Sequence, residues 1–144
     1  MAETIVPVDP DILPRSPAFA QGMIAPAGPL LFVGGQNGTD ATGALLRGLR
    51  AQTEQALRNV LAVLAEAGSG PEHVVKLNIH LAPGIDPSDA FAASAAVWGS
   101  RRTAVTVLVV APAKTGALVE IDAVAAVPGG GGAPDRAEGE EHSR

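Results

Sequence analysis

The sequence contains no cysteine and no tyrosine, and it has only three phenylalanines and one tryptophan. The absence of cysteine excludes a disulfide framework, a zinc ribbon, an iron–sulfur site and a thiol nucleophile. The scarcity of aromatic rings disfavours a base-stacking platform for RNA. A formal net charge of −5 means that the chain also lacks the basic surface with which proteins bind nucleic acid. We therefore expect no nucleic-acid partner.

Long hydrophobic runs are missing as well, because glycine, proline or a charge interrupts each apolar stretch before the ~20 residues that a membrane-spanning helix needs. The first residues, Met1-Ala-Glu-Thr-Ile, lack the basic and apolar regions of a signal peptide. The sequence thus predicts a soluble cytoplasmic protein without a membrane partner. With 144 residues, 47% of them hydrophobic, one core built from Ala, Val, Leu and Ile is expected.

The chain divides into one domain, 1–127, and a Gly-rich acidic tail, 128–144. The tail has no apolar side chains whose burial could offset the entropy lost on ordering, so it is predicted to be disordered.

Two segments have the pattern of helices. From Gly48 to Ala67, apolar residues recur at intervals of three and four, and Gly68 follows as a stop signal. A second helix is predicted to run through Ala90 to about Trp98, with Asp86 or Ser88 as the capping acceptor and Gly99 at its end.

The remaining apolar segments predict about six strands. The last one alternates, which places Glu120 and Asp122 on one face and Val119 and Ile121 on the other. The strand from Arg102 is almost continuously apolar, which is typical of a central strand buried on both faces. The second and third strands are expected to form a hairpin through the turn 26–29. The expected strands are Thr4–Val6, Gln21–Ala25, Leu30–Gly35, His73–Leu81, Arg102–Val110 and Ala117–Val127.

This order predicts an α+β fold, a single domain with a mixed sheet of about six strands and two helices on one face. Two helices cannot cover both faces of such a sheet. Because the strands carry apolar side chains on either side, we expect the other face to pack against copies of the same chain.

Two charged residues are candidates for chemistry. Arg102 opens an apolar strand, where its guanidinium could hold a small carboxylate, although an ordinary ion-paired arginine at a strand edge is the simpler interpretation. Glu120 lies between Val119 and Ile121 and could transfer a proton through a water, or else form a ladder ion pair or face an oligomer channel. His73 and His80 are expected on opposite faces of one strand, so no metal site is predicted.

The chain resembles the Rid superfamily of imine deaminases over nearly all of residues 3–127. The likeness rests on four stretches that are individually modest but specific in this order. They are Ser16-Pro-Ala-Phe-Ala-Gln-Gly22, Leu31-Phe-Val-Gly-Gly-Gln36, Gln52-Thr-Glu-Gln-Ala-Leu-Arg-Asn-Val-Leu61 continuing to Glu66-Ala-Gly68, and Gly116-Ala-Leu-Val-Glu-Ile-Asp-Ala-Val-Ala125.

The resemblance implies a chorismate-mutase-like homotrimer whose sheets surround a central barrel, with a cleft at each subunit interface. It also implies cofactor-independent hydrolysis of small 2-imino acids or enamines to 2-oxo acids and ammonia, a metabolite damage-control activity. In the active relatives an arginine at the position of Arg102 grips the substrate carboxylate together with main-chain groups at Ala104. The position of Glu120 holds the glutamate that orders the attacking water.

Three further positions of the implied cleft depart from the family pattern. Phe19 replaces a tyrosine, Gly34 replaces a serine, and Ala95 replaces an asparagine. The cleft is therefore more apolar than in the deaminases. This leaves open an alternative, a Rid-like protein that binds a small metabolite at the interface without deaminating it. An RNA-cleaving activity is disfavoured by the acidic charge and the few aromatics.

Overall fold

The computed structural model describes residues 4–130 of the chain. This part of the chain forms six strands and two α-helices, with short 3-10 turns at Pro71–His73 and Pro128–Gly130. In chain order the elements are β1 (Val6–Val8), β2 (Gly22–Ile24), β3 (Leu30–Asn37), α1 (Leu49–Glu66), β4 (Val74–Leu81), α2 (Pro87–Trp98), β5 (Ala104–Val109) and β6 (Val119–Ala126). The α+β class and the number of strands agree with the prediction.

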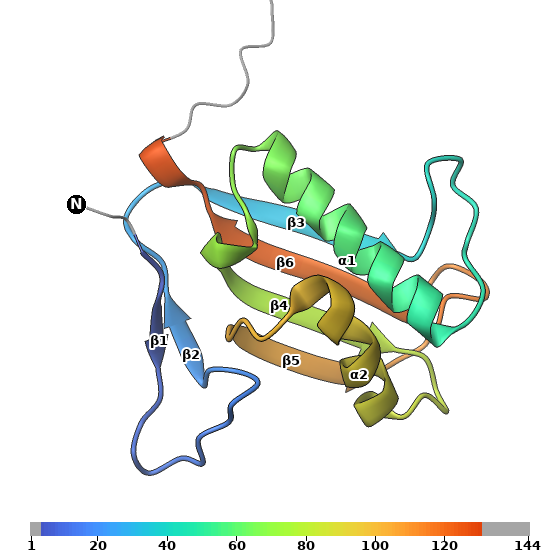
Figure 1. Cartoon of the computed structure of the whole chain (residues 1–144), viewed down its shortest axis with the longest axis horizontal. Helices are drawn as coiled ribbons and strands as arrows, with labels where there is room; N and C mark the ends of the chain where they lie inside the picture. Colours follow the sequence, from blue (N-terminus) through green and yellow to red (C-terminus); the bar gives the residue numbers. More distant parts are fainter. Residues whose placement is uncertain (1–3, 131–144) are drawn as a thin grey trace, which may run out of the picture.

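The strands form two separate sheets rather than one. β1 and β2 make a two-stranded antiparallel hairpin, and the main sheet has the order β3-β6-β4-β5. In the main sheet β4 and β5 are parallel, whereas β6 is antiparallel to both of its neighbours. Figure 1 shows the hairpin standing to one side of the main sheet.

Helix α1 follows the predicted apolar stripe closely. Its inward face is fully buried at Ala56, Leu57, Val60 and Leu64, which are 0–1% exposed. Gly68 follows the helix with a φ of 72°, a left-handed conformation in which glycine has no steric penalty. The predicted boundaries were accurate because the amphipathic pattern and the glycine stop agree.

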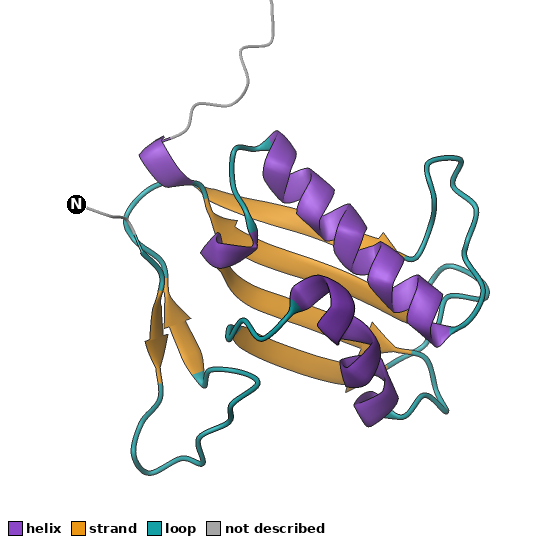
Figure 2. Ribbon diagram, in the orientation of Figure 1, coloured by secondary structure: helices purple, strands orange, loops and turns teal. Residues whose placement is uncertain are grey.

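Helix α2 begins where the sequence predicts a cap. Asp86 is the N-cap, and its carboxylate accepts a 2.8 Å hydrogen bond from the Ser88 amide. Of the two capping candidates, the acceptor is therefore Asp86 and not Ser88. Gly99 closes the helix with its amide bonded to the Ala95 carbonyl at 3.0 Å. The two helices lie side by side over one face of the main sheet (Figure 2).

The last strand, β6, is the centre of the core. Its residues alternate as predicted, with Val119, Ile121, Ala123 and Ala125 at 0–2% exposure. These side chains pack against α1 and the buried residues of β4. The intervening residues of β6 lie on the opposite face, which no helix of the described chain covers (Figure 1).

Besides the single six-stranded sheet, three expectations about the strands were wrong. The first strand is Val6–Val8 and not Thr4–Val6. The predicted hairpin between the second and third strands does not form, because β2 pairs with β1 and β3 pairs with β6. A turn signal shows that the chain bends, but it does not determine which strand becomes the partner.

The third error concerns β5, which is an edge strand and not a central one. Val107, Leu108 and Val109 are 45–56% exposed, so the strand is not buried on both faces within one chain. A continuous apolar pattern predicts that a strand is buried on both faces, but it does not show what buries it. The exposed side chains of β5 could be buried only by contact with another molecule.

Within residues 4–130, no helix combines the length and the apolar character required to cross a bilayer. The predicted tail, 128–144, begins with the 3-10 turn at Pro128–Gly130, and the rest of it lies outside the described residues.

Candidate functional site

Arg102 lies just before β5, and its guanidinium already holds a carboxylate. Its Nη2 is 2.8 Å from Oδ2 of Asp9 and donates a second hydrogen bond to the Phe19 carbonyl at 3.1 Å. Its Nε donates to the Ser16 carbonyl at 3.1 Å. The other terminal nitrogen, Nη1, makes no hydrogen bond to the described residues. The guanidinium of Arg102 is therefore held in place through Nε and Nη2, and its Nη1 is left to donate hydrogen bonds to a ligand.

Asp9 is the partner that fixes Arg102, and its environment favours the ionised form. Its Oδ1 accepts a hydrogen bond from the Gln21 amide at 3.0 Å. This bond and, next in order, the hydrogen bond from Arg102 lower the pKa of the Asp9 carboxyl below its ordinary value. Its side chain is only 7% exposed. The Asp9–Arg102 pair thus joins the loop after β1 to the start of β5.

The Asp9–Arg102 pair predicts an acid-dependent loss of stability. A carboxyl whose folded pKa is depressed stabilises the fold above its unfolded pKa, about 3.9, and loses that contribution as the pH falls through the folded value. Urea unfolding midpoints of the wild type and Asp9→Asn should therefore differ at neutral pH and converge below about pH 4.

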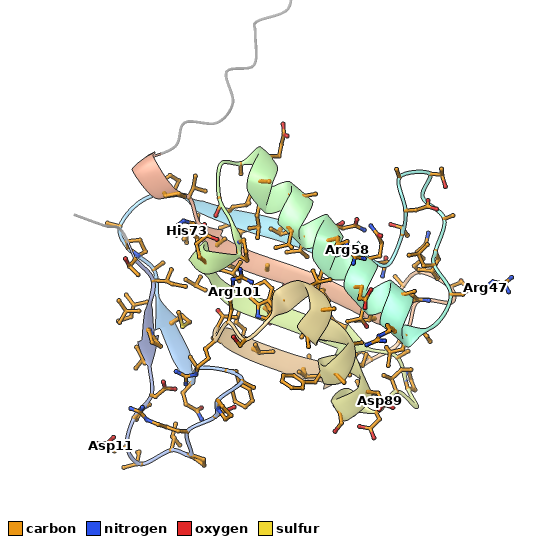
Figure 3. The ribbon with its side chains drawn as sticks, viewed as in Figure 1. Asp11, Arg47, Arg58, His73, Asp89 and Arg101 are labelled. Carbon is orange, nitrogen blue, oxygen red and sulfur yellow. The ribbon has the colours of Figure 1, made fainter. Side chains whose placement is uncertain are left out.

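The matched control for this prediction is Asp11→Asn. Figure 3 labels Asp11 in the loop between β1 and β2, and within residues 4–130 its carboxylate has no hydrogen bond or ion pair. This variant should follow the wild type at all pH values. A gap between the wild type and Asp9→Asn that stays constant down to pH 2.5 would contradict the role given to the pair.

Two of the other predicted site residues, Phe19 and Ala104, lie beside Arg102, and a third, Ala95, lines a cavity that includes the neighbouring Arg101. Ala20, next to Phe19, forms a bridge with Ala104, and its amide donates to the Thr103 carbonyl at 3.0 Å. Ala95 lines a cavity of about 340 Å³ together with Arg101 and the segment before Phe19. Figure 3 labels Arg101 at the end of the sheet that faces the β1–β2 hairpin.

Glu120 lies on the face of the sheet that carries no helix. It pairs in register with His80 of β4 and with Asn37 of β3. Its carboxylate makes no hydrogen bond or ion pair with the residues that the structure describes, and it lies over Gly35. A Cβ built on Gly35 would be 2.9 Å from Cδ of Glu120, so the missing side chain provides the space for this carboxylate. Gly34, which the sequence analysis also placed in the site, precedes Gly35. Both glycines lie where the register between β3 and β6 shifts, between Val33 and Gln36.

A row of polar side chains extends from Glu120 across the same face. Asn78 donates a 2.7 Å hydrogen bond to Oδ1 of Asp122, and Nδ1 of His80 lies 3.9 Å from Oδ2 of the same carboxylate. The ammonium group of Lys76 donates a hydrogen bond to the Thr106 hydroxyl. Asp122 thus has partners in Asn78 and His80, whereas the Glu120 carboxylate has none among the described residues.

The predicted residues therefore form two groups rather than one site. The strand registers place Ala104 opposite Lys76 and Glu120 opposite His80, four residues further along β4. At about 3.3 Å per residue these positions are ~13 Å apart along the strand, with a strand between them. A single chain does not bring Arg102 and Glu120 to one small substrate.

Two residues of this arrangement were missed by the sequence analysis. Asp9 is 93 positions from Arg102, and no local pattern connects them. Gly35 could have been found, because two adjacent glycines inside a strand indicate a bulge or a close approach. Within the described part of the chain, no group of three or more His, Cys, Asp and Glu is arranged to hold a metal ion.

Comparison with known proteins places this geometry in a family. The family model described as endoribonuclease L-PSP matches residues 14–127. No curated protein matches the chain.

Solved structures agree with the family match. A Yersinia pestis protein, described as the conserved Rid family protein YyfB of unknown function, has 28% identity and a TM-score of 0.75, covering 85% of this chain and 98% of its own. RidA of a Psychrobacter species has 28% identity and a TM-score of 0.60, covering 78% of this chain and 97% of its own. A hypothetical protein of Giardia lamblia has 28% identity and a TM-score of 0.61, with coverages of 85% and 98%. The chain therefore belongs to the Rid superfamily, whose sequence model is the one described as endoribonuclease L-PSP.

Proposed function

We propose that the protein hydrolyses small reactive 2-imino acids or their enamine tautomers to 2-oxo acids and ammonia, in a cleft between two copies of the chain. This proposal rests on one observation, which is that the predicted site residues fall into two separate groups. A carboxylate-binding arginine and an unpaired carboxylate lie at opposite ends of one sheet, and a second copy is needed to bring them together.

The uncovered face of the sheet supports such an assembly. Phe32 on β3 is 72% exposed and Leu108 on β5 is 50% exposed, although both belong to apolar segments. Apolar side chains of this size on the surface of a main sheet favour burial against another subunit. By analogy with the relatives that the sequence resembles, the assembly is a homotrimer around a central barrel.

The chemistry requires few groups. The substrate carboxylate would bind the free edge of Arg102 and main-chain groups at Ala104, which orients the C2 imine. Glu120 would accept a proton from water as the water oxygen bonds to C2 and would pass it to the imine nitrogen, which gives a carbinolamine. A second transfer through Glu120, from the new hydroxyl to the amino group, would form the C2 carbonyl as the C–N bond breaks and ammonia leaves. Water and imine thus give a 2-oxo acid and ammonia, and the imine carbon is already electrophilic without a cofactor.

The test uses 2-imino acids generated in situ by an amino-acid oxidase. If the proposal is correct, the purified protein accelerates 2-oxo acid formation and, because it removes the imine, lowers the initial rate at which semicarbazide traps it as the semicarbazone. If small, branched and aromatic imino acids all decay as in buffer, deamination is wrong. The alternative, a Rid-like protein that binds a small metabolite without reacting, would then be preferred.

Replacing Arg102 with alanine should raise KM for the imino acid about 30-fold. Truncating one partner of a sheltered, hydrogen-bonded charge pair costs about 2 kcal/mol or more. Arg101→Ala is the matched control, because Arg101 is the adjacent arginine and its Nη1 donates to the Trp98 carbonyl at the end of α2, at 2.8 Å. A large KM effect at Arg101 with none at Arg102 would mean that the carboxylate-binding arginine is assigned wrongly.

A further inference from the structure

The helix-covered side of the sheet contains a cavity whose lining shares only Phe19 with the predicted site residues. It has a volume of about 420 Å³ and lies between α2 and the main sheet. Leu77, Leu81, Val119 and Ile121 line it from the strands, and Leu57 lines it from α1. Cavities of this size hold small organic molecules in other proteins.

The lining of this cavity is largely apolar, and its hydroxyl-bearing residues are Thr53, Ser88 and Ser94. Phe91 of α2 is 63% exposed and Phe19 is 43% exposed, and both rings line the cavity. Among the described residues, no charged side chain contributes to the lining. A charged ligand would lose its hydration without gaining a partner, so the site favours a neutral molecule.

One polar group deep in this environment has no partner. Thr53 of α1 lines the cavity and is 2% exposed. Within residues 4–130, nothing forms a hydrogen bond with its Oγ1, which is itself buried. A helical threonine usually bonds to the carbonyl four residues earlier, which for Thr53 is that of Leu49. Leaving a buried hydroxyl unpaired is unfavourable, and a ligand oxygen would remove that cost.

We propose that this cavity binds a small, neutral, apolar molecule that carries one hydroxyl or carbonyl oxygen, which accepts a hydrogen bond from Oγ1 of Thr53. The hydrocarbon part of the ligand contacts the leucine, valine and isoleucine side chains, and the single oxygen fixes its orientation. The cavity lies on the opposite face of the sheet from Glu120, and Arg102 is not part of its lining, so the proposal does not rest on the deaminase activity even though Phe19 borders both sites.

The test compares cyclohexanol with methylcyclohexane, which has a methyl group in place of the hydroxyl. Methyl-labelled full-length protein is titrated with each, and the affinities are taken from shifts of the Leu57, Leu77 and Val119 methyl signals. Thr53→Val, which has nearly the same shape, should weaken cyclohexanol binding about five-fold and leave methylcyclohexane binding unchanged, as expected for one hydrogen bond. Thr53→Ser, which keeps the hydroxyl, should retain the selectivity.

Each contrary result overturns the proposal. If neither probe shifts these methyl signals, the cavity is not a ligand site. If Thr53→Val weakens both probes equally, or neither, the hydroxyl takes no part in recognition. In the wild type, intermolecular NOEs from the cyclohexanol ring to the Leu57 and Val119 methyls provide a check that needs no variant. Their absence at saturation would place the probe elsewhere.

Discussion

Glu120→Gln should lower kcat for 2-imino acid hydrolysis by at least about 100-fold, the usual contribution of a general acid–base group. The amide has the size of the carboxylate but cannot accept the proton of the attacking water. Because the Glu120 carboxylate has no hydrogen-bonding partner among residues 4–130, its replacement should leave the folding free energy nearly unchanged. Single-turnover rates and thermal melts on the same preparations measure both quantities.

Asp122→Asn is the control for this prediction, because Asp122 is the other carboxylate on the same face of β6. The amide oxygen of asparagine can still accept the hydrogen bond from Asn78, so the variant should stay within about three-fold of the wild-type rate. If both variants lose activity equally, the effect comes from the charge of the face and not from a proton transfer at Glu120. If neither loses activity, the role of Glu120 is wrong.

Gly38→Ala should destabilise the fold by about 3 kcal/mol, at the upper end of overpacking effects. A Cβ at Gly38 would lie 2.4 Å from Cα and 2.6 Å from the carbonyl oxygen of Gln52, in the first turns of α1. Backbone atoms cannot rotate away as the end of a side chain can, so the helix itself must move. At this chain length the expected fall in Tm is about 10 °C.

The displacement would also break the contacts that Gln52 makes. Its Nε2 donates to the carbonyls of Leu46 and Gly116, and its Oε1 accepts from the Leu118 amide at 2.8 Å. Gly34→Ala is the matched control for stability, because a Cβ there meets no atom within 4 Å. Its Tm should change by no more than a few degrees. An equal fall in both variants would mean that the loss reflects glycine replacement in and just after β3 in general, and not contact with Gln52.

The parts of the fold that sequence predicted well are those determined by local patterns. Helix α1 has an apolar stripe and a glycine stop, α2 has an Asp86 cap, and β6 alternates from Val119 to Ala125. Each of these signals acts within a few residues, so it can be read without knowing the rest of the fold.

The parts that were wrong or missed depend on contacts between distant segments. The partner of β2 is β1 and not the following strand, and the edge position of β5 depends on where β6 inserts. Contacts between distant segments also explain what was missed in the candidate site. Arg102 could be singled out by its place before an apolar strand, but its pairing with Asp9 joins segments that share no pattern.

The position of β6 has a consequence for how the chain folds during synthesis. β6 is the last strand to be made, yet it lies between β3 and β4 and supplies the hydrogen bonds that join them. Until residues 119–126 emerge from the ribosome, β3 has no neighbour in the main sheet, and the parallel β4–β5 pair has one open side. The main sheet must therefore assemble late, by insertion of a strand between two existing edges. Sheets with such distant pairings fold slowly and leave apolar edges exposed meanwhile, so chaperone dependence should be greatest just before β6 is added.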